Sequence, residues 1–246
     1  MKIKNILISQ PEPSNTNPYS DLIKKYGLKI DFYRFFNVSP LSSKDFRLQK
    51  IALLDHTAVV FTSKMNIDSF FSICEHSRIV VPEIMKYFCT SESVALYLQK
   101  YIVYRKRKIF YGNGRPDSLI SVIGTKHKNE KFLIATTDTP KSAVTKLFIK
   151  NKLNFTPAVL CKTVYSDLSM KNIHDYDILV FYSPTDVKSL LNNYPDYKQT
   201  NQLIATFGNM TAKEVKANNL KSSIVAPSPE APSIAKALSI YFENNR

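Results

Sequence analysis

Glycine is scarce in this chain, with five residues among 246. None of the five belongs to a Gly-x-Gly-x-x-Gly turn or to the glycine-rich loop that cradles the phosphates of nucleoside triphosphates. A dinucleotide site or a nucleoside triphosphate site is therefore not expected.

Cysteine is also rare. The three cysteines, Cys74, Cys89 and Cys161, lack the spacing of a disulfide framework or of a metal site. The four histidines show no ligand spacing either. Scattered cysteines of this kind are typical of reduced thiols, so we expect a cytoplasmic protein without a metal site.

No apolar run in the sequence is long enough to cross a membrane. The longest runs, such as residues 58–61, have the length of a single strand. Residues 1–8 mix basic and apolar side chains, but Ser9-Gln10-Pro11 follow at once. We therefore expect a buried first strand rather than a signal peptide, and no membrane partner.

Acidic residues are outnumbered, because 34 Lys and Arg face 20 Asp and Glu and leave a net charge of +14. Such an excess favours an anionic partner, namely nucleic acid, a membrane surface or a polyanionic small molecule, although it also adds solubility. The densest basic run, residues 105–108, leads into the strand-like residues 109–111 and accompanies no nucleic-acid motif. The aromatic residues cluster in apolar strands instead of alternating with lysines, which argues against a stacking platform for nucleic acid.

The chain repeats itself. Residues 54–63 resemble residues 174–183 at an offset of 120 (175 − 55), and each copy predicts a buried strand, a serine turn and a helix. The repeat continues at an offset of 118 (211 − 93) and then of 115 (224 − 109), where Ser118 falls on Ser233. A shorter unit also recurs, at residues 4–9 and 131–136. The matched pairs at the first offset include Asp55 with Asp175, Val60 with Val180, Phe61 with Phe181, Ser63 with Ser183 and Ser69 with Ser189.

The order of these units is short, long, short, long. Apolar strands that alternate with helices predict parallel sheets covered on both faces. The sequence therefore predicts an α/β protein with two similar doubly wound parallel-sheet domains. In such sheets ligands collect beyond the carboxyl ends of strands, where Ser9, Ser63, Thr136 and Ser183 stand.

Four ordered segments resemble uroporphyrinogen-III synthases. They are residues 60–64, 181–184, 204–212 and 226–233, and residues 85–110 are similar to the branch of the family found in Bacteroidetes-type bacteria. The resemblance covers nearly the whole chain in the correct order. It implies flavodoxin-like domains with interleaved segments, residues 1–31 joining residues 167–246 around a middle domain of residues 41–156. Residues 32–40 and 157–166 would be linker strands, and the active cleft would lie between the domains.

The resemblance also implies an activity. Members of this family close hydroxymethylbilane, a linear tetrapyrrole with eight carboxylates, into a ring and invert ring D through a spiro intermediate. It implies a monomeric lyase of tetrapyrrole (haem) biosynthesis that uses no cofactor and binds no nucleic acid. The protein must orient the polyanion and supply a proton to the departing hydroxyl. A non-catalytic two-lobed polyanion-binding protein of the same fold is the alternative, and a nucleic-acid-binding module is a third class.

Carboxylates bind well at helix N-termini, where unpaired backbone N–H groups converge. Four turns of this chain open predicted helices, although their hydroxyls also suit plain helix caps. Arg34, Arg115 and Lys141 are further candidates for carboxylate contacts. The residues that the resemblance assigns to substrate binding are Ser63, Lys64, Ser91, Ser93, Ser183, Pro184, Thr185, Gly208, Asn209, Met210, Thr211 and Ser228.

Three positions depart from the family pattern. Gln10 stands where the family often has arginine, and Asp186 stands where it commonly has glycine. Cys161 occupies the place of a tyrosine suspected of protonating the hydroxyl, and this absence favours the non-catalytic alternative. Tyr165, four residues further on, shares its strand face by parity. We therefore name Tyr165 and Cys161 as candidate catalytic residues. The alternative is that Cys161 is a core residue and Tyr165 a surface residue, neither with a role in catalysis.

Overall fold

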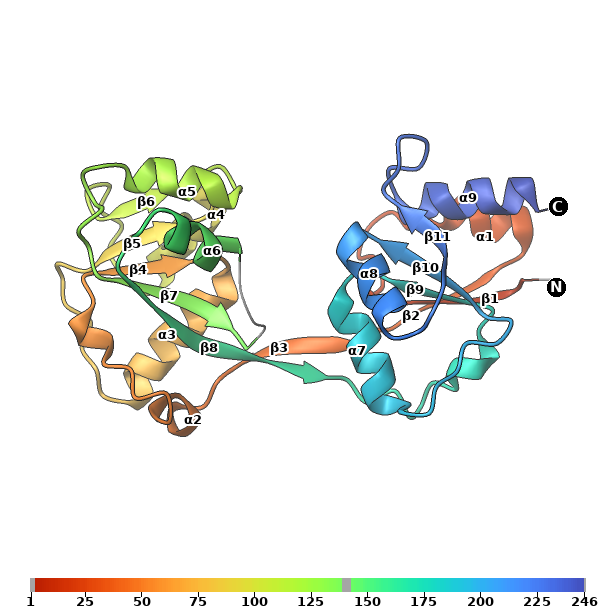
Figure 1. Ribbon diagram of the computed structural model, residues 1–246, viewed down its shortest axis with the longest axis horizontal. Coiled ribbons are helices and arrows are strands. Elements are labelled where there is room, and N and C mark those ends of the chain that lie inside the picture. The colour runs from red at the N-terminus through yellow and green to blue at the C-terminus, as the bar shows by residue number, and fades with distance from the viewer. Residues whose placement is uncertain (1–2, 139–142, 246) are drawn as a thin grey trace. The chain divides into compact units, whose positions relative to one another are not determined.

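The computed structural model describes residues 3–138 and 143–245, and these divide into two compact units (Figure 1). The first unit joins residues 1–37 to residues 165–246, and the second consists of residues 38–164. The chain therefore passes between the units twice, at 37/38 and at 164/165.

The first unit contains a five-stranded sheet in the order β2-β1-β9-β10-β11, and every pair of neighbours is parallel. Its strands are β1 (Asn5–Ile8), β2 (Lys29–Phe32), β9 (Ile178–Phe181), β10 (Leu203–Phe207) and β11 (Ser222–Ala226). Its helices are α1 (Ser20–Tyr26), α7 (Pro184–Asn193), α8 (Asn209–Ala217) and α9 (Ile234–Asn244), with the 3-10 helix η3 (Ile173–Asp175). The helices supply the crossovers that parallel strands require.

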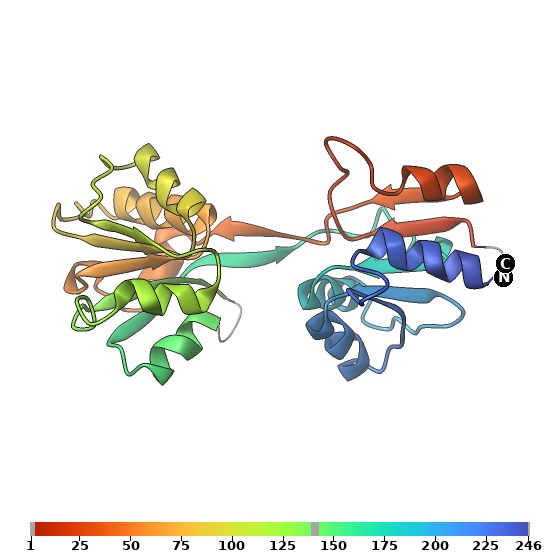
Figure 2. The ribbon, with the colours of Figure 1, turned by 90° about the horizontal axis from the view of Figure 1, so that it is seen from above.

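Helices cover both faces of this sheet. In β1, Ile6 and Ile8 pack with α1 and α9, whereas Leu7 packs with α7 and α8. α1 and α9 lie side by side (Figures 1 and 2), where the rings of Tyr26 and Phe242 stack with centroids 4.9 Å apart. Burial on both faces is the reason that the strands consist of consecutive apolar residues.

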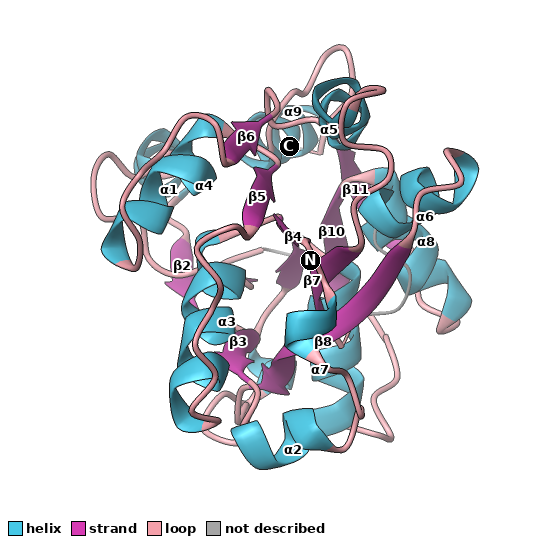
Figure 3. Cartoon of the chain, turned by 90° about the vertical axis from the view of Figure 1, so that its left-hand side faces the viewer, coloured by secondary structure: helices cyan, strands magenta, loops and turns pink. Residues whose placement is uncertain are grey.

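The second unit contains a six-stranded sheet in the order β3-β8-β7-β4-β5-β6 (Figure 3). The neighbours from β8 to β6 are parallel. Its strands are β3 (Phe36–Pro40), β4 (Ala58–Phe61), β5 (Lys86–Cys89), β6 (Ile109–Tyr111), β7 (Phe132–Thr137) and β8 (Phe155–Tyr165). Its helices are α2 (Ser43–Arg47), α3 (Lys64–His76), α4 (Glu92–Tyr97), α5 (Pro116–Ile123) and α6 (Ala143–Lys150), with the 3-10 helices η1 (Leu53–Asp55) and η2 (Leu98–Lys100).

The faces of the second sheet are covered in the same way. In β4, Val59 and Phe61 pack with α3 and α4, whereas Ala58 and Val60 pack with α5 and α6. α3 and α4 thus take the places that α7 and α8 have in the first unit, and α5 and α6 take those of α9 and α1. The internal repeat extends from the strands to the helices.

The two sheets share one strand order. In the first, the short unit supplies β1 and β2 and the long unit supplies β9, β10 and β11. In the second, β7 and β8 play the part of β1 and β2, and β4, β5 and β6 that of β9, β10 and β11. The first sheet therefore has the 2-1-3-4-5 order of flavodoxin-like folds. The second has the same order when its short unit is counted before its long unit, with β3 added at the edge beside β8. The predicted fold class, two similar doubly wound parallel-sheet domains, is confirmed.

The segments expected to be linker strands, residues 32–40 and 157–166, contain the two crossings between the units, and they also pair within a sheet. Residues 36–40 form β3 at the edge of the second sheet, and residues 155–161 of β8 pair with β7. β3 runs antiparallel to β8, because backbone bonds join Leu41 to Leu160 and Ser166 to Phe35. Much of 32–40 and 157–166 therefore belongs to a sheet, since pairing satisfies backbone groups that a free linker would leave to water.

Candidate functional site

The carboxyl ends of the strands bring the predicted turns together within each unit. In the first unit, Ser9 follows β1, Ser183 lies two residues after β9, and Gly208 follows β10. Ser9 and Tyr182 are joined across neighbouring strands, since the Tyr182 N–H donates to Ser9 Oγ over 3.3 Å. In parallel α/β sheets this edge is the usual ligand-binding edge.

The serines that precede α3 and α7 are helix caps. Ser63 Oγ accepts a hydrogen bond from the Asn66 N–H over 3.2 Å. Ser183 Oγ accepts one from the Asp186 N–H over 3.3 Å. Both hydroxyls thus have the structural role that serine takes at this position. Lys64 is the first residue of α3, and its Nζ lies 5.4 Å from the centroid of the Tyr97 ring.

The caps predict the effect of removing each hydroxyl. Ser63→Ala and Ser183→Ala should each lower the free energy of unfolding by about 1 kcal/mol, the usual cost of a lost N-cap. Catalytic activity at saturating substrate should stay within about threefold, because the backbone donors remain. Urea unfolding and a steady-state assay measure the two effects. A large loss of activity with unchanged stability would assign the hydroxyls to substrate instead.

Asp186 occupies the N-terminal turn of α7. Its Oδ2 accepts hydrogen bonds from the N–H groups of Tyr182 and Ser183, over 2.9 and 2.8 Å. The side chain is buried, and this burial raises the pKa of its carboxyl group against the opposing effect of these bonds. The turn formed by Ser183, Pro184 and Thr185 therefore already contains a carboxyl group and is poorly suited to a second one.

The turn before α8 is open by contrast. Gly208 is the N-cap, and with no side chain it makes no capping bond to the amides that follow. Its φ of +85° lies in the region that favours glycine. Asn209 and Met210 are exposed and Thr211 is buried, at the start of a nine-residue helix. Among the expected turns, this one best combines free N–H donors with a helix dipole.

The equivalent turn of the second unit precedes α4. Ser91 is its N-cap but makes no capping bond, and Ser91 Oγ lies 3.1 Å from Ser93 Oγ. Both serines line an open hollow of about 790 Å³, whose wall includes Glu92. The Tyr111 hydroxyl donates to Glu92 Oε1 over 3.1 Å. Because this wall carries a carboxylate, the hollow suits a polyanion less well than the α8 turn.

The loop between β11 and α9 contains Ser228, which is exposed. Ser228 Oγ accepts from the Ala231 N–H over 3.1 Å and so shapes the loop. Ser233 caps α9 by accepting from the Lys236 N–H. Ser118, which the repeat places on Ser233, is instead the third residue of α5 and accepts from the Asn113 N–H. The match of these two serines in sequence is therefore not a match in role.

Cys161 and Tyr165 lie on β8 but in different surroundings. Cys161 has no exposed surface, and its Sγ lies 3.1 Å from Ser69 Oγ and 3.4 Å from Asn66 Oδ1. Burial raises the pKa of its thiol. A thiol without exposed surface cannot contact a substrate, so Cys161 is not retained as a candidate catalytic residue. Tyr165 is 36% exposed, and its hydroxyl bonds to no other residue in the described part of the chain.

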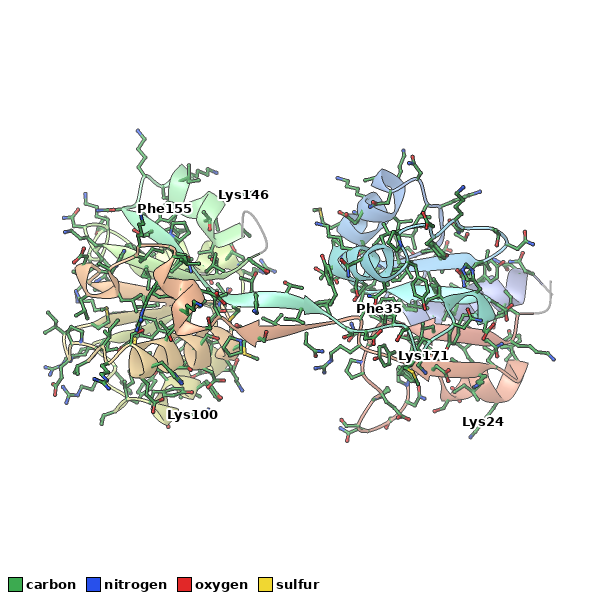
Figure 4. All side chains as sticks on the ribbon, turned by 90° about the horizontal axis from the view of Figure 1, so that it is seen from below. Lys24, Phe35, Lys100, Lys146, Phe155 and Lys171 are labelled. Atoms are coloured by element: carbon green, nitrogen blue, oxygen red, sulfur yellow. The ribbon has the colours of Figure 1, made fainter. Side chains whose placement is uncertain are left out.

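The basic candidates are dispersed. Arg34 Nη1 donates to Asn37 Oδ1 over 3.4 Å, and Arg115 is the N-cap of α5. Lys141 lies outside the described residues. Lys24 and Lys146 extend from helices into solvent (Figure 4). The charges of these two lysines are therefore exposed to solvent.

The run at residues 105–108 leads into β6, as predicted. Arg105 Nη1 lies 3.4 Å from Glu83 Oε2, and Lys108 donates to the Glu83 carbonyl oxygen. Half of this run is therefore engaged locally.

Two features of the site were not predicted. One is the capping role of Asp186, for which the Ser-x-x-Asp spacing at 183–186 was an available signal. The other is a pair of phenols, Tyr19 and Tyr182, whose hydroxyl oxygens lie 2.8 Å apart. They are separated by 163 residues in sequence, so no local pattern connects them.

Within residues 3–138 and 143–245, no group of three or more His, Cys, Asp or Glu side chains is arranged to hold a metal ion. In the same ranges, no helix combines the length and the apolar character needed to span a bilayer.

Comparison with known proteins supplies the family. The family model described as uroporphyrinogen-III synthase HemD matches residues 17–236. A crystal structure of uroporphyrinogen-III synthetase from Helicobacter pylori is similar with a TM-score of 0.57 at 14% identity, covering 98% of this chain and 100% of that chain. A mutant uroporphyrinogen III synthase from the extremely thermophilic bacterium Thermus thermophilus is similar with a TM-score of 0.54 at 12% identity, covering 98% of each chain. No curated protein matches the sequence significantly.

Proposed function

This chain belongs to the uroporphyrinogen-III synthase family, and from that premise we propose that it is a lyase that closes hydroxymethylbilane into uroporphyrinogen III with inversion of ring D. The observation that carries the proposal is the family match over residues 17–236, which extends over both units and includes the turns before α3, α4, α7 and α8. The proposal includes a monomeric, cytoplasmic enzyme that acts without a cofactor on a small-molecule substrate and binds neither nucleic acid nor membrane.

The α8 turn is the proposed anchor for a substrate carboxylate. The N–H groups of Asn209, Met210 and Thr211 have no capping side chain, and the dipole of α8 adds to their attraction for an anion. The turn before α7 contributes less, because Asp186 already accepts hydrogen bonds there. The first unit thus offers one open and one occupied turn on neighbouring strands.

The reaction itself needs little from the protein beyond position, water exclusion and a proton. Loss of the terminal hydroxyl leaves an azafulvene cation, and the substrate's own pyrroles supply the electrons for ring closure. Holding a flexible chain of four pyrroles in one geometry removes much of the entropic part of the barrier. The resemblance implies a tyrosine as proton donor at the place that Cys161 occupies, and Tyr165 is an exposed phenol at the end of the same strand, β8.

A coupled assay from porphobilinogen tests the proposal. Porphobilinogen is converted to hydroxymethylbilane by a deaminase, this protein is added, and the oxidised products are separated. Isomer III in excess over isomer I supports the synthase. If isomer I alone forms while the protein binds the linear tetrapyrrole, the non-catalytic alternative holds.

The net charge predicts a salt dependence. With a charge of +14, attraction of a substrate with eight carboxylates should accelerate encounter, and added salt should screen it. We expect kcat/KM to fall several-fold between about 0.05 and 0.5 M sodium chloride, a range over which the Debye length shortens from roughly 14 to 4 Å. Steady-state kinetics at constant pH measure the effect. A flat response would leave the charge as a contribution to solubility.

A further inference from the structure

Tyr182 stands between the two turns of the first unit. It follows β9 directly and precedes Ser183, the N-cap of α7. Its ring centroid lies 5.5 Å from that of Phe207, which precedes Gly208, the N-cap of α8. The phenol therefore belongs to the edge of the sheet where the proposed carboxylate anchor lies.

The hydroxyl of Tyr182 is paired with that of Tyr19 over 2.8 Å. Tyr19 is 3% exposed, and a buried hydroxyl needs a partner for its proton. The Tyr182 oxygen is the partner available among the described residues, and the contact allows either hydroxyl to donate. We take the arrangement in which the more deeply buried Tyr19 donates and Tyr182 accepts. Tyr182 is only half-buried, and its own proton remains free for a third group.

This direction of donation makes Tyr182 the more acidic phenol of the pair. Burial raises the pKa of both tyrosines. The bond between them raises the pKa of Tyr19 further and lowers that of Tyr182, because it stabilises a phenolate at Tyr182. A phenol that can lose its proton to a ligand and keep a hydrogen bond afterwards has the properties of a general acid.

The internal repeat indicates that packing does not require a phenol here. At the equivalent position of the second unit, 120 residues earlier, stands Thr62. Its Oγ1 accepts a hydrogen bond from Asn66 Nδ2 over 3.0 Å within its own unit. The two halves share the strand, the serine cap and the helix, but only the first half places a phenol pair at this turn.

We propose that Tyr182, rather than Tyr165, protonates the departing hydroxyl of hydroxymethylbilane, and that Tyr19 is the positioning residue that holds it. This inference rests on the proposed function. The O–H bond of Tyr182 breaks, its proton joins the hydroxyl oxygen, and the C–O bond breaks as water departs with the electron pair. An azafulvene cation and a Tyr182 phenolate remain. The pyrrole carbon that later forms the new bond loses a proton, which restores the phenol.

Three tyrosine-to-phenylalanine variants test the assignment. Tyr182→Phe should lower kcat at least tenfold, within the range of about 10²–10⁴-fold typical of a general acid, with KM changed less than threefold. Tyr19→Phe should lower kcat by a smaller factor, because Tyr182 keeps its proton but loses its support. Tyr165→Phe tests the rival donor named from the sequence and should stay within twofold of the parent.

A second substrate separates proton donation from structure. In an analogue whose hydroxyl is replaced by acetate, the leaving group departs as an anion and needs no proton. On this analogue Tyr182→Phe and Tyr19→Phe should match the parent. Thermal unfolding confirms that each variant is folded.

The outcomes distinguish this inference from the proposed function. An active parent with an equally active Tyr182→Phe, or an equal loss on both substrates, overturns the assignment alone. A tenfold loss in Tyr165→Phe with none in Tyr182→Phe does the same and returns the role to Tyr165. A parent that forms no isomer III from either substrate overturns the proposed function and this assignment with it.

Discussion

Asn209→Pro is expected to lower kcat/KM by about 10- to 100-fold while the protein stays folded. Asn209 is the first residue of α8, and its N–H is one of the donors proposed to hold a substrate carboxylate. Proline removes this N–H, yet it is well tolerated at the first position of a helix. A hydrogen bond to a charged group contributes about 1.5–3 kcal/mol, which corresponds to this loss. Steady-state kinetics with hydroxymethylbilane measure it.

Ser43→Pro provides the matched control. Ser43 is the first residue of α2, a helix with no proposed contact to substrate, so the same chemical change should leave kcat/KM within twofold. Urea unfolding should show that both variants retain most of the parent stability. If Asn209→Pro is as active as Ser43→Pro, the amides of α8 do not hold the substrate.

Cys161→Phe is expected to destabilise the second unit by about 1–3 kcal/mol, because Cys161 has no exposed surface and a larger side chain must displace its neighbours. The repeat shows how each half fills this place. In the first unit Ile8 pairs with Phe32, and Phe35 (Figure 4) lies three residues after Phe32. The backbone oxygen of Phe35 accepts a hydrogen bond from the Ser189 hydroxyl. In the second unit Ala135 pairs with Ala158, and Cys161 lies three residues after Ala158. Its thiol contacts the hydroxyl of Ser69, which corresponds to Ser189 in the repeat.

A second position differs between the two halves of the repeat in the opposite sense. Leu190 of the first unit corresponds to Phe70 of the second. The first unit therefore combines Phe35 with a leucine, and the second combines Cys161 with a phenylalanine. Each combination packs against an equivalent aromatic ring, Phe181 or Phe61. The double variant Cys161→Phe with Phe70→Leu should therefore recover at least half of the stability lost by Cys161→Phe.

Urea unfolding of the two single variants and the double variant measures the coupling. Additive losses would show that the two sites do not share one packing volume. The same reasoning applies to Cys161→Tyr, since the family's tyrosine would have to enter a filled core rather than face a substrate.

Periodicity and repetition in the sequence determined the fold class. The apolar runs of β4 and β9, the serine that ends each, and the helix that follows match at an offset of 120, and both copies form the predicted elements. Such features depend on residues close in sequence, where backbone geometry and burial on two faces act directly. The repeat alone left open which short unit joins which long unit, because both carry the same strand pattern.

Only the tertiary structure decided the details of the site. An extra residue in β8, where the register with β7 shifts at Thr136/Thr137, leaves both Leu160 and Cys161 buried, so strand parity did not predict the place of Cys161. Tyr19 and Tyr182 meet because β1 and β9 are neighbours, although 163 residues separate them. Contacts of this kind follow from packing between distant segments, to which no local sequence period corresponds.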